Sequence, residues 1–111
     1  MQLSITSFKR NFGATGEIRY EFSHGNTLIG VASVSSNQAS HFIHFITVMP
    51  DDRGKGYGSA ILEALCQMFN DKPLWLELDA SSPFGLDKLR MWYERHGFTQ
   101  MFGDYMVREP L

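Results

Sequence analysis

Apolar and polar residues alternate along most of the first half of the chain, with the period of two that half-buried strands show. The pattern predicts a short strand over residues 3–8, a second that ends at residues 24–26, and a third over residues 27–35. Residues 41–48 form a β-branched and aromatic run, which we expect to be buried on both faces. Because polar turns join these segments, we predict an antiparallel meander.

From Tyr57 the apolar spacing changes to that of a helix, which residues 70–73 should end. Residues 74–78 alternate again and predict a strand that a right-handed crossover would place parallel to residues 41–48. A second helix is expected from Ser82-Pro83 to His96-Gly97, and a hairpin after it. The side chains expected to face inward are Ile61, Leu62, Leu65, Met68 and Phe69 in the first helix, and Leu86, Leu89, Trp92 and Tyr93 in the second.

Length and composition limit the chain to one compact domain, since 111 residues with 43% hydrophobic residues leave no room for a second core. The net charge of −2 gives no overall basic field for nucleic acid or an anionic membrane. Apolar runs fall short of the ~20 residues that span a bilayer, and the amino terminus lacks a signal-peptide core. We therefore expect a cytoplasmic protein. Cys66 is alone, so no internal disulfide is expected.

Residues 53–58, Arg-Gly-Lys-Gly-Tyr-Gly, separate the last apolar strand run from the first helical run. The start of a helix leaves amide donors without partners, and glycines let an anion approach the main chain. A P-loop is excluded, because Gly56 follows Lys55 where that motif needs serine or threonine. A dinucleotide fingerprint is only half met: Asp79 is suitably spaced, but Ser59 stands where the third glycine belongs.

The order Arg53, Gly56, Gly58 fits an R/Q-x-x-G-x-G/A signature and resembles motif A of the GNAT superfamily of N-acetyltransferases. MWYERHGF at residues 91–98 resembles the second motif of that family, and the resemblance covers residues 41–108. It implies a single GNAT-like domain over residues 1–111: a mixed α/β fold with a mostly antiparallel sheet, a splayed parallel strand pair and flanking helices. It also implies direct transfer of acetyl from acetyl-CoA to an amine, without a metal.

The resemblance also implies where acetyl-CoA binds. The amides of the glycine loop would hold its pyrophosphate, a strand edge would pair with its pantetheine arm, and a main-chain donor near Val48 would meet the acetyl carbonyl. The implied cofactor-binding residues are Ile46, Thr47 and Val48 on the strand, and Arg53, Gly54, Lys55, Gly56, Tyr57, Gly58 and Ser59 in the loop and helix start.

Tyr93 matches the family tyrosine that protonates the departing thiolate, although its spacing also fits a core tyrosine. No acid stands where the family commonly has a glutamate base; Phe42 and His44 occupy that neighbourhood. By strand alternation His44 shares a face with Phe42, Ile46 and Val48, and histidine titrates in a range that suits a base. His44 is therefore a candidate base, with a hydrogen-bonded structural histidine as the alternative. The reserve bases, each acting through a water, are Glu21, Glu77 and Asp79.

Two histidines, His41 and His44, invite a metal interpretation, but residues three apart on a strand point to opposite faces, so we expect no shared metal. Cys66 lies among apolar helix positions and is expected to be buried, not an acyl carrier.

The chain departs from the family pattern in two places. Leu86 stands where the family often has an asparagine, for which Ser82 or Asp87 could substitute, and only residues 7–16 occupy the place of two helices on the acceptor side. We therefore expect an amine acceptor of unassigned identity, with a protein or peptide favoured, and a possible homodimer. The alternative is a non-catalytic acyl-CoA sensor that acts on a protein partner; a dinucleotide-binding fragment is a third hypothesis.

Overall fold

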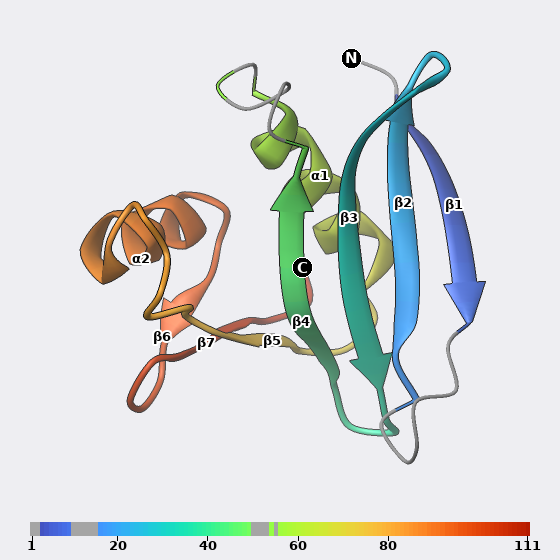
Figure 1. Ribbon diagram of the computed structural model, residues 1–111. Helices are drawn as coiled ribbons and strands as arrows, with labels where there is room; N and C mark the ends of the chain where they lie inside the picture. The colour runs from blue at the N-terminus through green and yellow to red at the C-terminus, as the bar shows by residue number, and fades with distance from the viewer. Residues whose placement is uncertain (1–2, 10–15, 50–53, 55) are drawn as a thin grey trace.

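The computed structural model describes residues 3–9, 16–49, 54 and 56–111. Within them, strands β1 to β7 form one sheet in the order β1-β2-β3-β4-β5-β7-β6 (Figure 1). All neighbours are antiparallel except β4 and β5, which confirms the predicted fold class. The elements in chain order are β1 Ser4–Lys9, β2 Ile18–His24, β3 Thr27–Ser36, β4 His41–Val48, α1 Tyr57–Met68, β5 Leu74–Glu77, α2 Leu86–Arg95, β6 Thr99–Gln100 and β7 Tyr105–Arg108.

The parallel pair is short and splayed, as predicted. Strand β4 pairs with β5 only from His41↔Leu74 to Ile43↔Leu76, although β4 continues to Val48. Figure 1 shows the end of β4 running away from β5 and toward the start of α1. The second half of β4 therefore stays paired with β3 on one edge but is no longer paired with β5 on the other.

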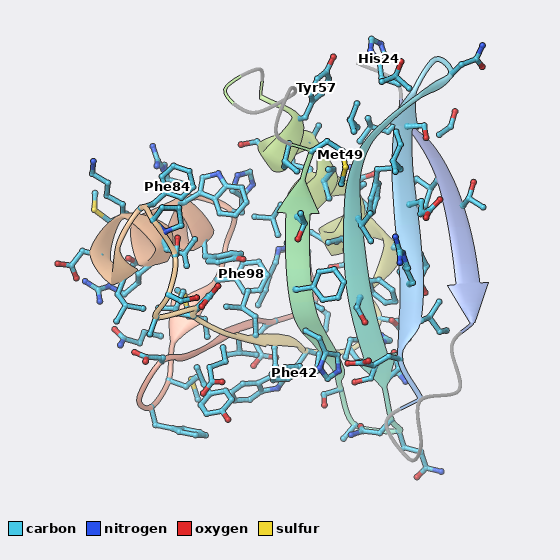
Figure 2. The ribbon with its side chains drawn as sticks, viewed as in Figure 1. His24, Phe42, Met49, Tyr57, Phe84 and Phe98 are labelled. Atoms are coloured by element: carbon cyan, nitrogen blue, oxygen red, sulfur yellow. The ribbon has the colours of Figure 1, made fainter. Side chains whose placement is uncertain are left out.

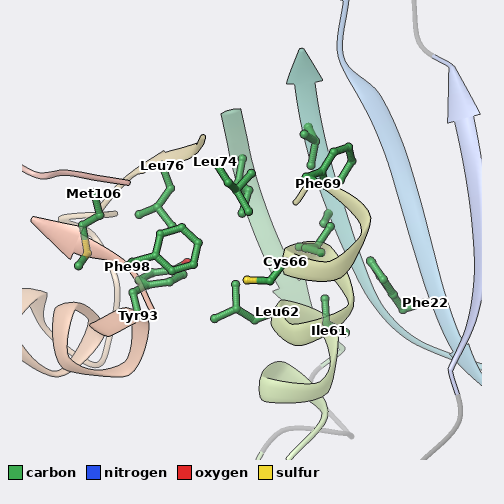
Figure 3. Packing of buried hydrophobic residues seen from close by; sticks show 14 of the residues in the cluster. Phe22, Ile61, Leu62, Cys66, Phe69, Leu74, Leu76, Tyr93, Phe98 and Met106 are labelled. Atoms are coloured by element: carbon green, nitrogen blue, oxygen red, sulfur yellow. The ribbon is translucent and has the colours of Figure 1, made fainter. Parts of the chain in front are cut away.

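The core lies on one face of the sheet, where both helices pack (Figure 3). Leu62 and Cys66 of α1 and Tyr93 of α2 belong to the same buried cluster as Leu76 of β5. Cys66 is buried, as expected, and its pKa is raised by burial, an effect that outweighs the charge of Arg108. The prediction for Met68 was wrong: this last residue of α1 is 38% exposed, although the next residue, Phe69, is buried in the cluster.

The opposite face of β1 to β4 carries no helix in Figure 1. Phe45 of β4 is 46% exposed there, and His44 and Thr47 are also exposed. The prediction that residues 41–48 are buried on both faces was therefore wrong. The run resembles a buried strand in composition, but nothing in the described residues covers its second face.

Helix α2 begins later than predicted and ends where predicted. Gly85, with φ 80° and ψ 156°, caps its start, while the Ser82 hydroxyl accepts the Phe84 N–H in the preceding turn. At the other end His96 is the cap, and Gly97 takes the left-handed conformation that L side chains rarely adopt. The loop of residues 78–85 therefore stays free of the helix and can border a site.

Among the described residues, no helix is both long and apolar enough to cross a membrane. The cytoplasmic location and the homodimer stay predictions.

Candidate active site

The glycine loop and the start of α1 leave open space above main-chain donors. Gly54 and Gly56 have φ of 82° and 80°, and, chain neighbours aside, no atom of the described residues lies within 4 Å of where a β-carbon would stand on either. No side chain caps the helix at Gly56, so the first amides of α1 have no side-chain partner there. This is the arrangement expected of an anion-binding helix start. Arg53 and Lys55, predicted to assist, lie outside the described residues.

Next to this loop, α1, β4 and α2 come close together. A β-carbon on Gly58 would lie 3.6 Å from Val48 on β4 and 3.6 Å from Trp92 on α2. The indole N–H of Trp92 donates to the Ser59 hydroxyl at 3.2 Å, which ties α2 to the first turn of α1. The Tyr57 side chain is directed elsewhere, since its hydroxyl lies 3.4 Å from His24 Nδ1 (Figure 2).

A cavity of about 680 Å³ starts at these glycines and follows the splayed half of β4. Helix α2 and the loop before it form the other wall. Its lining includes the predicted Ile46, Thr47, Val48, Gly54, Gly56, Gly58, Ser59, His44 and Tyr93, and also Ser82, Phe84, Leu89 and Trp92. The structure thus brings most of the predicted residues to one continuous space.

A second cavity, of about 450 Å³, opens beside the end of β5 and has a more polar lining. Glu77, Asp79 and Asp104 contribute carboxylates to it, and Phe42 contributes an aromatic wall. The two cavities have Ile43, His44, Glu77 and Asp79 in common. Two molecules, one in each cavity, would therefore meet at the point where β4 and β5 part.

His44 occupies a β-bulge, which changes its predicted orientation. The β3–β4 pairing passes from Ser33↔Phe45 to Val34↔Ile43 and skips His44. The bulge lets Ile43 and Ile46 both pack toward the core, while the His44 ring lies 5.0 Å from the Phe42 ring. His44 therefore shares a face with Phe42, as predicted, but not with Ile46 and Val48.

Both ring nitrogens of His44 have partners on the open face of the sheet. Nε2 lies 2.7 Å from the Ser35 hydroxyl, and Nδ1 lies 3.1 Å from the Glu17 carboxylate. Sequence reasoning missed Ser35 and Glu17. No signal in the sequence could have found them, because the bulge that brings them together has no mark in the residue pattern.

Tyr93 is almost fully buried and lines the larger cavity. Burial raises its pKa to about 12, and the charge of Asp79 adds to the shift. Its ring packs against Trp92 and Phe98, with centroids 4.9 and 5.5 Å away. Tyr93 is therefore a core residue that also borders the cavity, and its role toward the departing thiolate stays a prediction.

The remaining candidates are placed as follows. His41 points to the face opposite His44, as predicted, and its Nε2 contacts Asp71 at 2.7 Å. Of the possible substitutes for the family asparagine, Ser82 borders the larger cavity, whereas Asp87 is exposed and bonded to Arg90. Within the described ranges, no three His, Cys, Asp or Glu side chains gather as metal ligands.

The family model for an acetyltransferase (GNAT) domain matches residues 18–100, which is most of the chain. The chain belongs to the GNAT acetyltransferase family. The family match extends from β2 to β6 and so includes both sides of the cleft between β4 and α2. A search of curated proteins found no match.

Solved structures of GNAT proteins share the fold at low sequence identity. The ribosomal-protein-S18-alanine N-acetyltransferase of Escherichia coli has a TM-score of 0.74 at 18% identity, covering 96% of this chain and 93% of its own. An Elizabethkingia anophelis GNAT acetyltransferase with acetyl-CoA bound has a TM-score of 0.71 at 14% identity, covering 96% and 97%. A putative GNAT acetyltransferase from Bacteroides thetaiotaomicron has a TM-score of 0.69 at 21% identity; the match covers 91% of this chain but only 65% of that one.

Proposed function

We propose that this protein transfers the acetyl group of acetyl-CoA directly to a primary amine. The observation that carries the proposal is the meeting of two cavities at His44, Glu77 and Asp79, one starting at the glycine loop and one lined by carboxylates. The first has the shape and donors for an extended anionic donor, and the second has the charge for an ammonium group. Bound acetyl-CoA would supply the activated thioester.

The donor end fits the charge and shape of coenzyme A. Gly54 and Gly56 adopt the left-handed conformation and have open space beside them, and the start of α1 offers amides to a phosphate. The β4 edge at residues 46–48 has parted from β5 and borders the cavity, so an extended pantetheine arm can lie along it. The Elizabethkingia anophelis GNAT acetyltransferase, which this chain resembles in fold, has acetyl-CoA bound in its structure.

The acceptor end would attract a cation and must then neutralise it. Glu77, Asp79 and Asp104 favour an ammonium group, but only the neutral amine attacks a thioester. Bringing a lysine-like amine from a pKa of about 10.4 to neutral pH costs on the order of 4 kcal/mol. His44 is the proposed base, because it borders both cavities where they meet; a water held by Glu77 or Asp79 is the alternative.

The acceptor is proposed to be a protein or peptide amine. The open face beside the smaller cavity leaves room for an extended chain, and a neighbour in fold acts on an alanine of ribosomal protein S18. Incubation with acetyl-CoA and a panel of peptides and small amines, followed by thiol release and mass spectrometry, tests this. Acetylation of peptide amines supports the proposal. Acetylation of small amines alone would refute the choice of acceptor, and no acetylation at all would refute the activity.

A second candidate function is the acyl-CoA sensor, and one observation favours it. Both nitrogens of His44 are already engaged, as in a structural histidine, and Leu86 replaces the family asparagine. A sensor would bind coenzyme A in calorimetry but release no thiol with any amine, and Tyr93→Phe would change nothing. Turnover by the unaltered protein rules it out.

A further inference from the structure

Ser35 and Glu17 both contact His44 on the open face of the sheet, Ser35 through a hydrogen bond and Glu17 through a carboxylate–imidazole ion-pair contact. The Ser35 hydroxyl is 2.7 Å from His44 Nε2, and the Glu17 carboxylate is 3.1 Å from His44 Nδ1. Of the three, only His44 borders the two cavities. Ser35 and Glu17 border neither cavity, so they contact the His44 ring without filling the space that a substrate would occupy.

The partners determine which nitrogen of a neutral His44 carries its proton. The Glu17 carboxylate offers only lone pairs, so its position 3.1 Å from Nδ1 favours the neutral tautomer that carries its hydrogen on Nδ1. The lone pair then lies on Nε2, where the Ser35 hydroxyl donates to it. A serine hydroxyl turns away by rotation about one bond, so this nitrogen can exchange its resting partner for a proton from elsewhere.

His41, on the other face of the sheet, has a similar pair of partners, a serine and an aspartate, with the two ring nitrogens exchanged. The Ser36 hydroxyl is 2.6 Å from His41 Nδ1, and Asp71 is 2.7 Å from His41 Nε2. The His41 ring is buried against Phe69, with centroids 4.8 Å apart, and borders neither cavity. Through Asp71, His41 joins the turn that follows α1 to β4. His41 and its partners therefore offer a matched structural control.

We propose that Glu17 and Ser35 are positioning residues for His44, which rests on the proposed acetyl transfer. Glu17 holds the proton on Nδ1 and stabilises the charge that the ring gains, while Ser35 occupies and orients Nε2 until the acceptor arrives. The N–H bond of the acceptor then breaks, and its proton joins Nε2. The ring becomes an imidazolium paired with Glu17, a division of labour that resembles other histidine bases oriented by an acid.

Glu17→Gln and Ser35→Ala test the proposal beside the matched controls Asp71→Asn and Ser36→Ala. Nitrogen NMR of the imidazoles in the protein without ligand reports the tautomer of each histidine. We expect His44 to be protonated on Nδ1 in the unaltered protein and to become a mixture of tautomers in Glu17→Gln. In turnover, Glu17→Gln should lower kcat about 10- to 100-fold, with KM for the amine and affinity for coenzyme A changed less than about twofold. Ser35→Ala should lower kcat by a smaller factor.

The controls should keep kcat within about twofold while lowering the thermal unfolding temperature. Coenzyme A affinity shows whether each variant is folded. Unchanged kcat in Glu17→Gln, a hydrogen on Nε2 in the unaltered protein, or acetyl found on Ser35 would each overturn the proposal. If the unaltered protein has no turnover, both the proposed function and this inference fail. If the unaltered protein turns over but Glu17→Gln keeps its kcat, only this inference fails.

Discussion

The variant Tyr93→Phe tests whether this phenol transfers its proton to the departing thiolate or only donates a hydrogen bond to it. Burial and Asp79 raise the Tyr93 pKa to about 12, whereas an alkyl thiol has a pKa of about 8.5. Complete transfer would therefore be uphill by about 3.5 pKa units, or about 5 kcal/mol. We expect Tyr93 to donate a hydrogen bond to the thiolate while solvent supplies the proton. Loss of one such bond to a charged group, about 1.5–3 kcal/mol, should lower kcat about 10- to 150-fold.

The measurement is steady-state thiol release by Tyr93→Phe across pH, with coenzyme A binding as the control for folding. The ring contacts with Trp92 and Phe98 survive the change, so affinity should stay within about twofold. Asp79→Asn removes a charge that raises the Tyr93 pKa, so that pKa should fall, as ultraviolet titration of the phenol would show. An unchanged kcat in Tyr93→Phe would refute the role, and a loss above about 10⁴-fold would refute the hydrogen-bond argument in favour of a complete acid.

Two glycine variants and a pH titration give further predictions. Gly58→Ala should keep or slightly raise stability, because the new β-carbon would meet Val48 and Trp92 at an ordinary 3.6 Å. The same variant should bind coenzyme A about tenfold more weakly in calorimetry, because its methyl group enters the cavity. Gly30→Ala should lower the free energy of unfolding in denaturant by about 1–3 kcal/mol, because the new β-carbon would collide with the Ile61 side chain of α1 and lie 2.8 Å from the Thr47 carbonyl oxygen of β4. The Tyr93 pKa is raised from 10.0 to about 12, so the contribution of Tyr93 to stability is complete below pH 10 and is lost as pH rises toward 12. The free energy of unfolding should therefore fall by about 3 kcal/mol over that window, and by less in Tyr93→Phe.

The strands and both helices were predictable because each depends on local pattern, whereas the place of the cleft was implied by the resemblance to the family. Alternation located β2 and β3, and the change of spacing at Tyr57 located α1 at its first residue. The glycine motif predicted the donor end, where Gly54 and Gly56 do adopt conformations that favour glycine. The start of α2 was misplaced because Ser82-Pro83 is a plausible helix start, whereas Gly85 is the residue at the cap.

The geometry around His44 could not be predicted, because it depends on a bulge. Strict alternation places His44 with Ile46, whereas one unpaired residue in the β3–β4 ladder returns Ile46 to the core and leaves His44 outside. The cost of burying a histidine beside Ile46 is avoided in this way. Its partners Ser35 and Glu17 come from two other parts of the chain, so no spacing rule joins them to His44.

The eight residues between β1 and β2 are too few for two helices, and this connects the fold to the acceptor side. In the described residues no helix covers the face of β4 on which His44 and Phe45 are exposed. Without such cover, residues 41–48 have the composition of a buried strand but only one buried face. For the proposed amine acceptor, we therefore expect selection less by an enclosing wall than by charge and by reach to the point where β4 and β5 part. An amine on a flexible peptide end meets both conditions, whereas a small amine gains little from a surface that encloses so little of it.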